Sequence, residues 1–204
     1  MNKIISGIQQ IGIGVPDKEA AWRWYRKHFG MDIPIFEDAA EAPHMSSYTG
    51  NEVQSRSATL ALNIQGGGGF EIWQYTSRNP DPPKFTIQLG DTGIFAAKIK
   101  TKNIKETYKA FTKDGVNIVN HIVRDPGGNP HFFVKDPHGF LFQIVESANW
   151  FTLDKHHTGG QVGCIIGVSD VEEALKLYRD ILGYDTVLYD EKGVFDDFTG
   201  LSGD

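Results

Sequence analysis

Residues 8–30, IQQIGIGVPDKEAAWRWYRKHFG, decide the fold. The first eight alternate between apolar and polar or small residues, which predicts a strand, and Pro16 with Asp17 ends it. Apolar residues then recur at helical spacing until Gly30. The Asp17 carboxylate can accept from free amides of the first helical turn, and glycine suits the left-handed conformation that closes a helix. We therefore predict a strand, a turn and a capped helix.

The same unit returns twice. It reads FAAKIKTKNIKETYKAFTKDG at residues 95–115 and VGCIIGVSDVEEALKLYRDILG at residues 162–183. Asn103 and Asp170 take the place of Asp17, and a glycine again follows each helix. Because cap, apolar stripe and closing glycine recur in order, the chain is built from one repeated unit.

Each unit continues into strands, of which the closing ones at residues 70–74 and 141–146 are best marked. The fold class is therefore α+β, with paired β-α-β-β-β modules forming a curved mixed sheet and helices on its outside. We expect residues 5–147 to make one eight-stranded sheet.

We divide the chain into a complete two-module domain at 1–147, a linker at 148–160 and an incomplete third module at 161–204. The third helix has a complete apolar stripe but only a strand at 185–190 after it. An uncovered apolar stripe is seldom tolerated in a monomer. We expect cover from further modules after residue 204, from the first domain, or from a second protomer in a homodimer.

Composition excludes several classes of function. The 204 residues carry a net charge of −6 without a basic run, which argues against nucleic acid and against an anionic membrane surface. The apolar stretch near the N-terminus is too short for a signal peptide or a membrane-spanning helix. We therefore expect a cytoplasmic protein. Cys164 is the only cysteine, and we interpret it as a small buried hydrophobe.

Alternation assigns side chains to the two faces of the first sheet. Ile11 and Ile13 face the helix, whereas Gln10 faces the other side, either into a space or at an edge. Glu71 shares the side of Gln10, and a carboxylate is rare in an apolar strand. Trp73 and Tyr75 follow on that side.

Two features of the first module we interpret as structural. The four glycines at 66–69 join strand to strand without a following Gly-Lys-Ser/Thr, so we predict a flexible hairpin and not a phosphate loop. His28 belongs to the helix stripe and is interpreted as a helix-surface residue.

The second module offers Lys98 beside Ala96 on one strand face, and His131 with Phe133 on another. Lys98 has a stem long enough to neutralise Glu71. His131 is either a metal ligand or a satisfied structural histidine. The closing strand carries Gln143.

The repeated module, with the turn Asp136-Pro137-His138-Gly139 before its last strand, resembles the vicinal oxygen chelate superfamily of glyoxalases, bleomycin-resistance proteins and extradiol dioxygenases. The resemblance implies that two modules form a cup holding a divalent metal, such as zinc, nickel, manganese or iron. Carried over by position, the metal ligands are Gln10, Glu71 and Gln143. Ala96 replaces a usual histidine, which leaves a poor set of donors.

The resemblance implies three functions. The first is a glyoxalase-like lyase or isomerase acting on a small molecule with vicinal oxygens, with Glu71 as proton carrier. The second is a non-catalytic binding protein whose ligand lies against Trp73, Tyr75 and Phe133. The third is an extradiol-type dioxygenase, which needs two imidazoles and a carboxylate.

Overall fold

The computed structural model describes residues 5, 7–152 and 155–203. The first module contains β1 (Gln10–Gly14), α1 (Lys18–Phe29), β2 (Ile33–Glu41), β3 (Ser55–Leu62) and β4 (Gly69–Tyr75), with the short helix η1 (Pro43–Tyr48) between β2 and β3. Its strands form a four-stranded sheet in the order β1-β4-β3-β2, in which only β1 and β4 are parallel. Asp17 accepts from the Ala20 amide, and Gly30 ends α1 in the left-handed conformation, as the sequence predicts.

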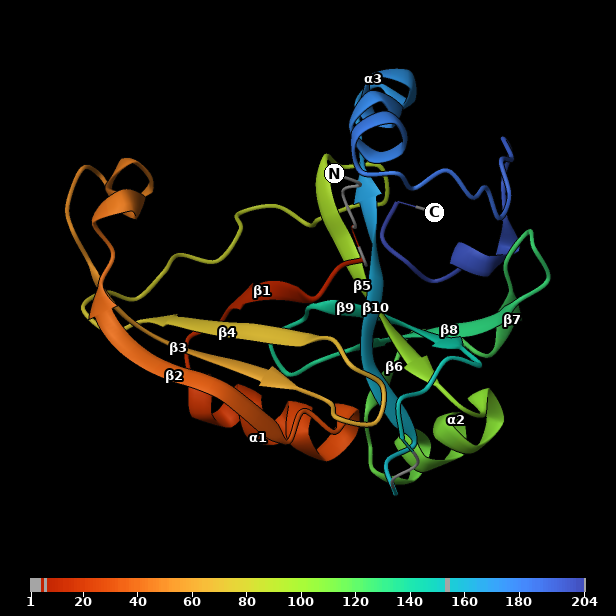
Figure 1. The fold of residues 1–204 in the computed structure, drawn as a ribbon, viewed down its shortest axis with the longest axis horizontal. Helices are drawn as coiled ribbons and strands as arrows, with labels where there is room; N and C mark the ends of the chain where they lie inside the picture. The colour runs from red at the N-terminus through yellow and green to blue at the C-terminus, as the bar shows by residue number, and fades with distance from the viewer. Residues whose placement is uncertain (1–4, 6, 153–154, 204) are drawn as a thin grey trace.

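The second module repeats this order with β5 (Gly93–Thr101), α2 (Ile104–Lys113), β6 (Asn117–Ile118), β7 (Val123–Arg124), β8 (Pro130–Lys135) and β9 (Leu141–Glu146). Asn103 caps α2 through the amides of Lys105 and Glu106. The predicted fold class is confirmed. In Figure 1 both helices lie on the same side of the molecule, below the sheets.

The expectation of a single eight-stranded sheet is wrong. The second sheet has six strands in the order β10-β5-β9-β8-β6, with β7 also on β8, because β10 (Thr158–Gly167) pairs antiparallel with β5. The long β10 runs beside β5 through the centre of Figure 1. Within the described residues, no strand of one sheet pairs with a strand of the other.

The two sheets share one apolar core, to which α1 contributes side chains. The Phe29 ring lies 4.9 Å from that of Phe142 in β9, 6.2 Å from Phe70 in β4 and 6.3 Å from Phe111 in α2. The hydroxyl of Tyr25 donates to Asp136 at 2.6 Å, in the turn between β8 and β9. Side chains of α1 therefore connect the two modules, whose described strands do not pair with each other.

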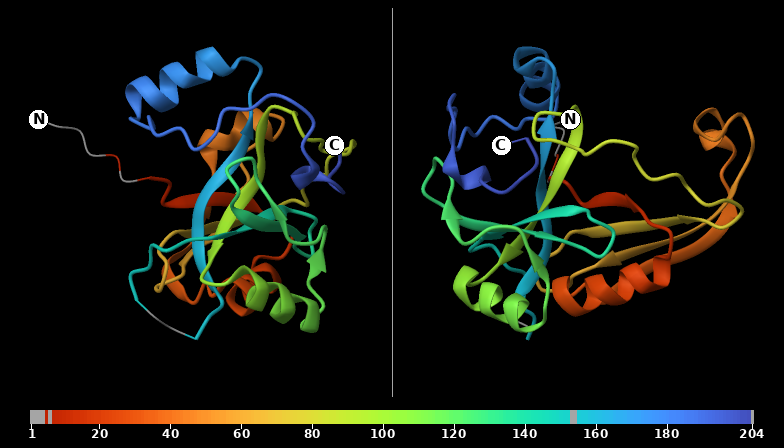
Figure 2. Two further views of the ribbon diagram at one scale, coloured as in Figure 1. Left: turned by 90° about the vertical axis from the view of Figure 1, so that its right-hand side faces the viewer. Right: turned by 180° about the vertical axis from the view of Figure 1, so that it is seen from behind.

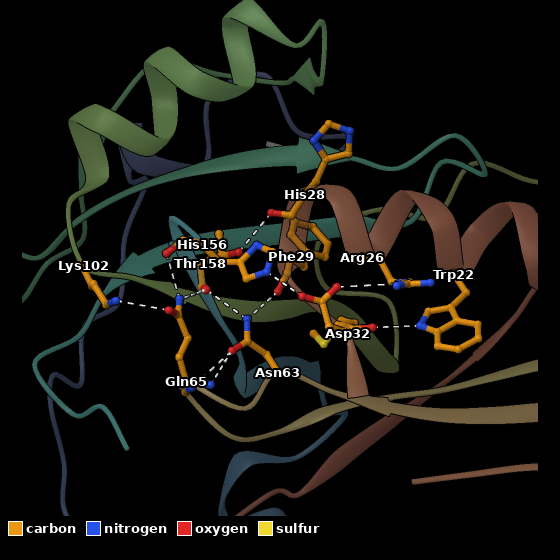
Figure 3. Close-up of polar contacts among 12 residues, drawn as sticks. Trp22, Arg26, His28, Phe29, Asp32, Asn63, Gln65, Lys102, His156 and Thr158 are labelled. Atoms are coloured by element: carbon orange, nitrogen blue, oxygen red, sulfur yellow. Dashed lines mark hydrogen bonds and ion pairs between the residues drawn. The ribbon is translucent and has the colours of Figure 1, made fainter. Parts of the chain in front are cut away.

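The carbonyls at the end of α1 find partners in distant segments (Figure 3). Asn63 donates to the Phe29 carbonyl at 2.8 Å and to the Thr158 carbonyl at 3.0 Å, and the Thr158 hydroxyl donates to the His28 carbonyl at 3.0 Å. The last carbonyls of a helix lack partners within the helix, so these bonds satisfy them. They also fix the start of β10 against the first module.

The four glycines are a crossing point and not a free hairpin. A Cβ on Gly66 would lie 1.6 Å from the Gly159 carbonyl oxygen, and one on Gly68 would lie 2.2 Å from that of Gln161. Two backbones therefore meet here at a distance that only glycine allows. The predicted linker is anchored at the same place, where His156 contacts Asp32 at 2.6 Å.

The third module contains less regular secondary structure than its sequence pattern predicts. It contains α3 (Val171–Leu175), a π-helical turn η2 (Lys176–Ile181) and the short η3 (Asp196–Phe198). The strand predicted at 185–190 does not form: these residues are exposed and irregular, and they pair with no strand. Leu177 and Ile181 are exposed, and Figure 2 shows α3 projecting from the sheets. The division at residues 147 and 160 stays a prediction.

The burial of His28 and Cys164 can be compared with the interpretation of the sequence. His28 is buried beside Trp24 and Phe111, and not on the helix surface. Cys164 is half-buried. None of the described helices is long and apolar enough to cross a membrane.

Replacing Gly66 by alanine should lower the free energy of unfolding by roughly 2–4 kcal/mol, because the new methyl group meets the backbone of Gly159. Gly12→Ala is the matched control, since its Cβ would meet nothing within 4 Å. Urea unfolding of both variants measures the difference. Equal stability of the two variants would contradict the proposed close crossing.

Stability should also fall as the pH is lowered below about 6.5. Burial, assisted by Lys27 and opposed by Asp114, lowers the pKa of His28. The folded state therefore prefers neutral His28, so its contribution is complete above the unfolded-state pKa and declines as pH falls below it. His28→Gln should weaken this pH dependence in thermal unfolding between pH 7.5 and 5.5. The same change at exposed His44 should not.

Candidate functional site

Gln10 and Glu71 meet on the face of the first sheet that is turned away from α1. The parallel pairing of β1 with β4 sets Gly12 opposite Glu71, two residues from Gln10. The Gln10 amide then donates to the Glu71 carboxylate at 2.9 Å. Both side chains are half-buried, so this pair remains accessible to a ligand. We call this face of the first sheet the first cup face.

Aromatic rings extend the first cup face along β4. Trp73 and Tyr75 lie edge to face with 4.7 Å between ring centroids, and the Arg78 guanidinium stands 5.9 Å from the Tyr75 ring. Gly12 and Gly14 of β1 leave open space, since a Cβ on either would meet nothing within 4 Å. The face therefore combines a carboxylate, an amide and an aromatic wall beside free space.

The remaining predicted site residues lie on the second sheet. Strand register sets Lys98 and Phe133 on either side of Gln143 in one row. The His131 ring lies 5.5 Å from that of Phe133. Ala96, two residues before Lys98, packs against Phe133. We call this face, defined by Lys98, His131, Phe133 and Gln143, the second cup face.

Several polar atoms of the second cup face have no hydrogen-bond partner among the described residues. Both ring nitrogens of His131 and the amide oxygen of Gln143 are buried without a hydrogen bond in the described part of the chain. Lys98 likewise makes no hydrogen bond or ion pair with any described residue. Burial lowers the pKa of Lys98 and of His131. The carboxylate of Asp125 opposes the shift of Lys98, and that of Asp197 is the main group that opposes the shift of His131. Buried polar atoms without a hydrogen bond are uncommon in folded proteins, so their concentration on this face needs an explanation.

The predicted residues therefore form two groups. Gln10, Glu71, Trp73 and Tyr75 lie together on the first cup face, and the others lie together on the second. Over the described ranges, no hydrogen bond or ion pair links Glu71 to Lys98 or to Gln143. Neutralisation of Glu71 by Lys98 stays a prediction.

The residues present do not fit a tightly bound divalent metal. Glu71 is the one charged oxygen donor of the predicted set, its partner Gln10 turns an amide N–H toward it, and Gln143 belongs to the other sheet. In residues 5, 7–152 and 155–203, no three His, Cys, Asp or Glu side chains are close enough to hold a metal ion. Neutral amides bind divalent cations weakly compared with carboxylates or imidazoles.

The sequence did not reveal what covers the second cup face. Residues of η3 and its flank lie on it: Phe198 stands 6.0 Å from Phe133, and Leu201 packs with Phe133 and Ala96. Asp197 lies 3.8 Å from His131. The sole signal in the sequence is an acidic and aromatic run, Asp-Asp-Phe, and such a run does not specify where it packs.

A separate cavity of about 520 Å³ lies at the start of α2. Its lining comes from α2, β7 and neighbouring residues: Asn103, Ile104, Lys105, Ile122, Val123, Arg124, Pro130 and Glu146. None of the predicted site residues lines it. The Glu146 carboxylate already accepts from the Ile104 amide there, so it acts in capping the helix.

Comparison with known proteins agrees with this architecture. Residues 7–144 match the model of the Glyoxalase/Bleomycin resistance protein/Dioxygenase superfamily. No curated protein matches the chain. A glyoxalase family protein from Bacillus cereus is similar over 71% of this chain and 95% of its own, with 16% identity and a TM-score of 0.55.

Glyoxalase I from Zea mays is similar over 87% of this chain, with 17% identity and a TM-score of 0.54. This chain spans 55% of that enzyme. At such identities the likeness shows the fold and does not identify an activity.

Added zinc, nickel or manganese should leave the melting temperature of the protein unchanged, because the donors do not form a metal site. Differential scanning fluorimetry with and without chelator measures this, since an ion that binds the folded state alone raises the midpoint. A rise of several degrees that Glu71→Gln abolishes would show that Glu71 is a metal ligand after all.

Proposed function

Because the chain belongs to the Glyoxalase/Bleomycin resistance protein/Dioxygenase superfamily, we propose that it binds a small molecule on the first cup face. The observation that carries this proposal is the Gln10–Glu71 hydrogen bond beside an aromatic wall. The bond uses one carboxylate oxygen of Glu71, and the other accepts no hydrogen bond from a described residue. That oxygen is available to a ligand hydroxyl.

The aromatic wall supplies the second part of the binding energy. Trp73 and Tyr75 are half-buried, so a planar ligand can still remove apolar ring surface from water. Small sites of this kind combine apolar lining with a few placed polar groups. A planar molecule with two adjacent oxygens meets both requirements.

A second candidate is a lyase or isomerase in which Glu71 carries the proton. It is favoured by the same free oxygen, because Gln10 fixes the carboxylate while leaving that oxygen able to accept a proton from a substrate carbon. The dioxygenase alternative is less well supported, because such a site needs two imidazoles and a carboxylate, and the positions that correspond to the imidazoles carry Gln10 and Ala96. We retain the binding function as the first proposal.

Assembly and location are proposals too. The first cup face lacks an opposite wall within hydrogen-bonding distance of Glu71 in the described residues, so we propose that a second copy or further modules supply one. We keep the division into 1–147, 148–160 and 161–204 and the cytoplasmic location as part of the same proposal.

Trp73→Leu should weaken the binding of catechol, a planar molecule with adjacent oxygens, by about tenfold, which equals about 1.4 kcal/mol. Isothermal titration calorimetry measures the affinity. Tyr48→Leu, at an exposed position of η1, is the control and should bind like the wild type. If catechol binds equally to all three proteins, or to none, the aromatic wall is not the binding surface for this class.

Glu71→Gln separates the two candidates. If the protein is a lyase, it should convert the hemithioacetal of methylglyoxal and glutathione, and the variant should lose roughly 10²–10⁴-fold in kcat while KM changes little. If the protein only binds ligands, wild type and variant should show the same background rate.

A further inference from the structure

The end of the chain covers the second cup face. In Figure 1 and in the right panel of Figure 2, the η3 segment lies against β7 and β8. Phe198 and Leu201 contact the apolar part of the face, as described above. Leu201 is 5% exposed, so this contact is well packed. Residues 195–201 therefore fill the place that a ligand of this face would need.

Several polar atoms in this contact lack hydrogen bonds to described residues. Asp197 is buried and its Oδ2 atom has no hydrogen bond, although His131 Nε2 is 3.8 Å away. His131 and Gln143 beneath it also keep buried atoms without partners. A buried polar group without a partner costs about 1–3 kcal/mol. As a permanent interior this arrangement is unfavourable, whereas it suits a surface that is only temporarily covered.

The covering segment has main-chain contacts to two loops. The Ser202 carbonyl, just after the segment, accepts from the Leu89 amide at 2.7 Å, and the Asp197 carbonyl accepts from Asn120 at 3.4 Å. The preceding residues are exposed, and Val194 is 99% exposed. Segments with few buried contacts open at low free-energy cost compared with core strands.

We propose that residues 195–201 are a built-in plug of the second cup face, and that this face takes an aromatic anion when the plug is displaced. The plug itself presents this chemistry, a carboxylate from Asp197 next to a phenyl ring from Phe198. Lys98 stands on the same face without an ion pair, and Phe133 offers its ring. The inference rests on the proposed binding function, since it assigns ligand chemistry and regulation to the other half of the cup.

The plug leaves Lys98 without a charge partner. An anion lying in the row of Lys98 and Gln143 would give Lys98 the charge partner that Asp197 does not provide. A hydrogen bond from a charged donor to an anion is stronger than one between neutral groups. A ligand therefore gains contacts that the plug does not make, and this difference lets it compete with a tethered segment.

The test uses the fluorescent aromatic anion 1-anilinonaphthalene-8-sulfonate with the full chain. Replacing Phe198 and Leu201 together by alanine should strengthen its binding at least tenfold, and Val194→Ala should leave binding unchanged. The added change Lys98→Ala should remove most of the gain. Unchanged binding in the double variant, or a gain that does not need Lys98, would overturn the proposal.

Chemical modification provides a second measure. His131 should react slowly with diethyl pyrocarbonate in the wild type and about as fast as exposed His44 in the double variant, as read by peptide mass spectrometry. Near-ultraviolet circular dichroism must stay like that of the wild type, so that probe binding reports an open face and not a loosened core. A His131 that already reacts rapidly in the wild type contradicts the plug.

If the double variant does not fold, the wild type itself still tests the proposal. Saturating probe should speed amide hydrogen exchange of residues 195–201, because a bound anion expels them, while exchange in β1 to β4 stays the same. Unchanged or slower exchange in 195–201 refutes displacement. Trp73→Leu distinguishes the two proposals: it should weaken catechol binding about tenfold without altering the probe effects, so either proposal can fail alone.

Discussion

The structure depends on α1 belonging to two sheets at once. Phe29 is in ring contact with β4, β9 and α2, and Tyr25 donates to Asp136 across the module boundary. Because no ladder of backbone hydrogen bonds connects the described strands of the two sheets, these side-chain contacts set their relative position. A helix that is apolar on a wide face can serve both partners, whereas one with a narrow stripe could cover only one sheet.

A second constraint is the passage of the chain from the second module into β10. The glycines of residues 66–69 and Gly159 let two backbones approach, and Asn63 bonds both to the end of α1 and to Thr158. Trp150 lies beside this crossing, with the Lys100 ammonium 5.1 Å from its ring. Once β10 is anchored there, it pairs with the open edge of β5. That pairing occupies the free edge of β5, so no strand of the first module can pair there, as a single continuous sheet would need.

The two groups of predicted site residues lie on different sheets, and this limits what each group can bind. A carboxylate with one amide partner can recognise a hydroxyl or accept a proton, but it offers a divalent cation one charged ligand. The second face carries a cation and an imidazole, so the two faces are complementary in charge. The covering segment adds Asp197 and Phe198 to the second face, where they lie against His131 and Phe133.

The sequence by itself determined everything that depends on short-range pattern. Alternation put Gln10, Glu71 and Trp73 on one face, and the cap residues placed both long helices within a residue of their observed ends. These features follow from the strand period of two and from local hydrogen bonding at helix ends, which neighbouring residues decide. The fold class and the composition of each face could be predicted for the same reason.

Only the tertiary structure decided which surfaces meet. His28 is buried because α2 packs beside it, and Gly66 and Gly68 have no room for a side chain because the backbones of Gly159 and Gln161 cross them. Residues 185–190 have a strand-like pattern but pair with no strand. Asp197 lies 3.8 Å from His131, although the two are 66 positions apart in the sequence. Contacts between residues so distant in sequence depend on competition among all the surfaces of the folded chain, and no local pattern encodes its outcome.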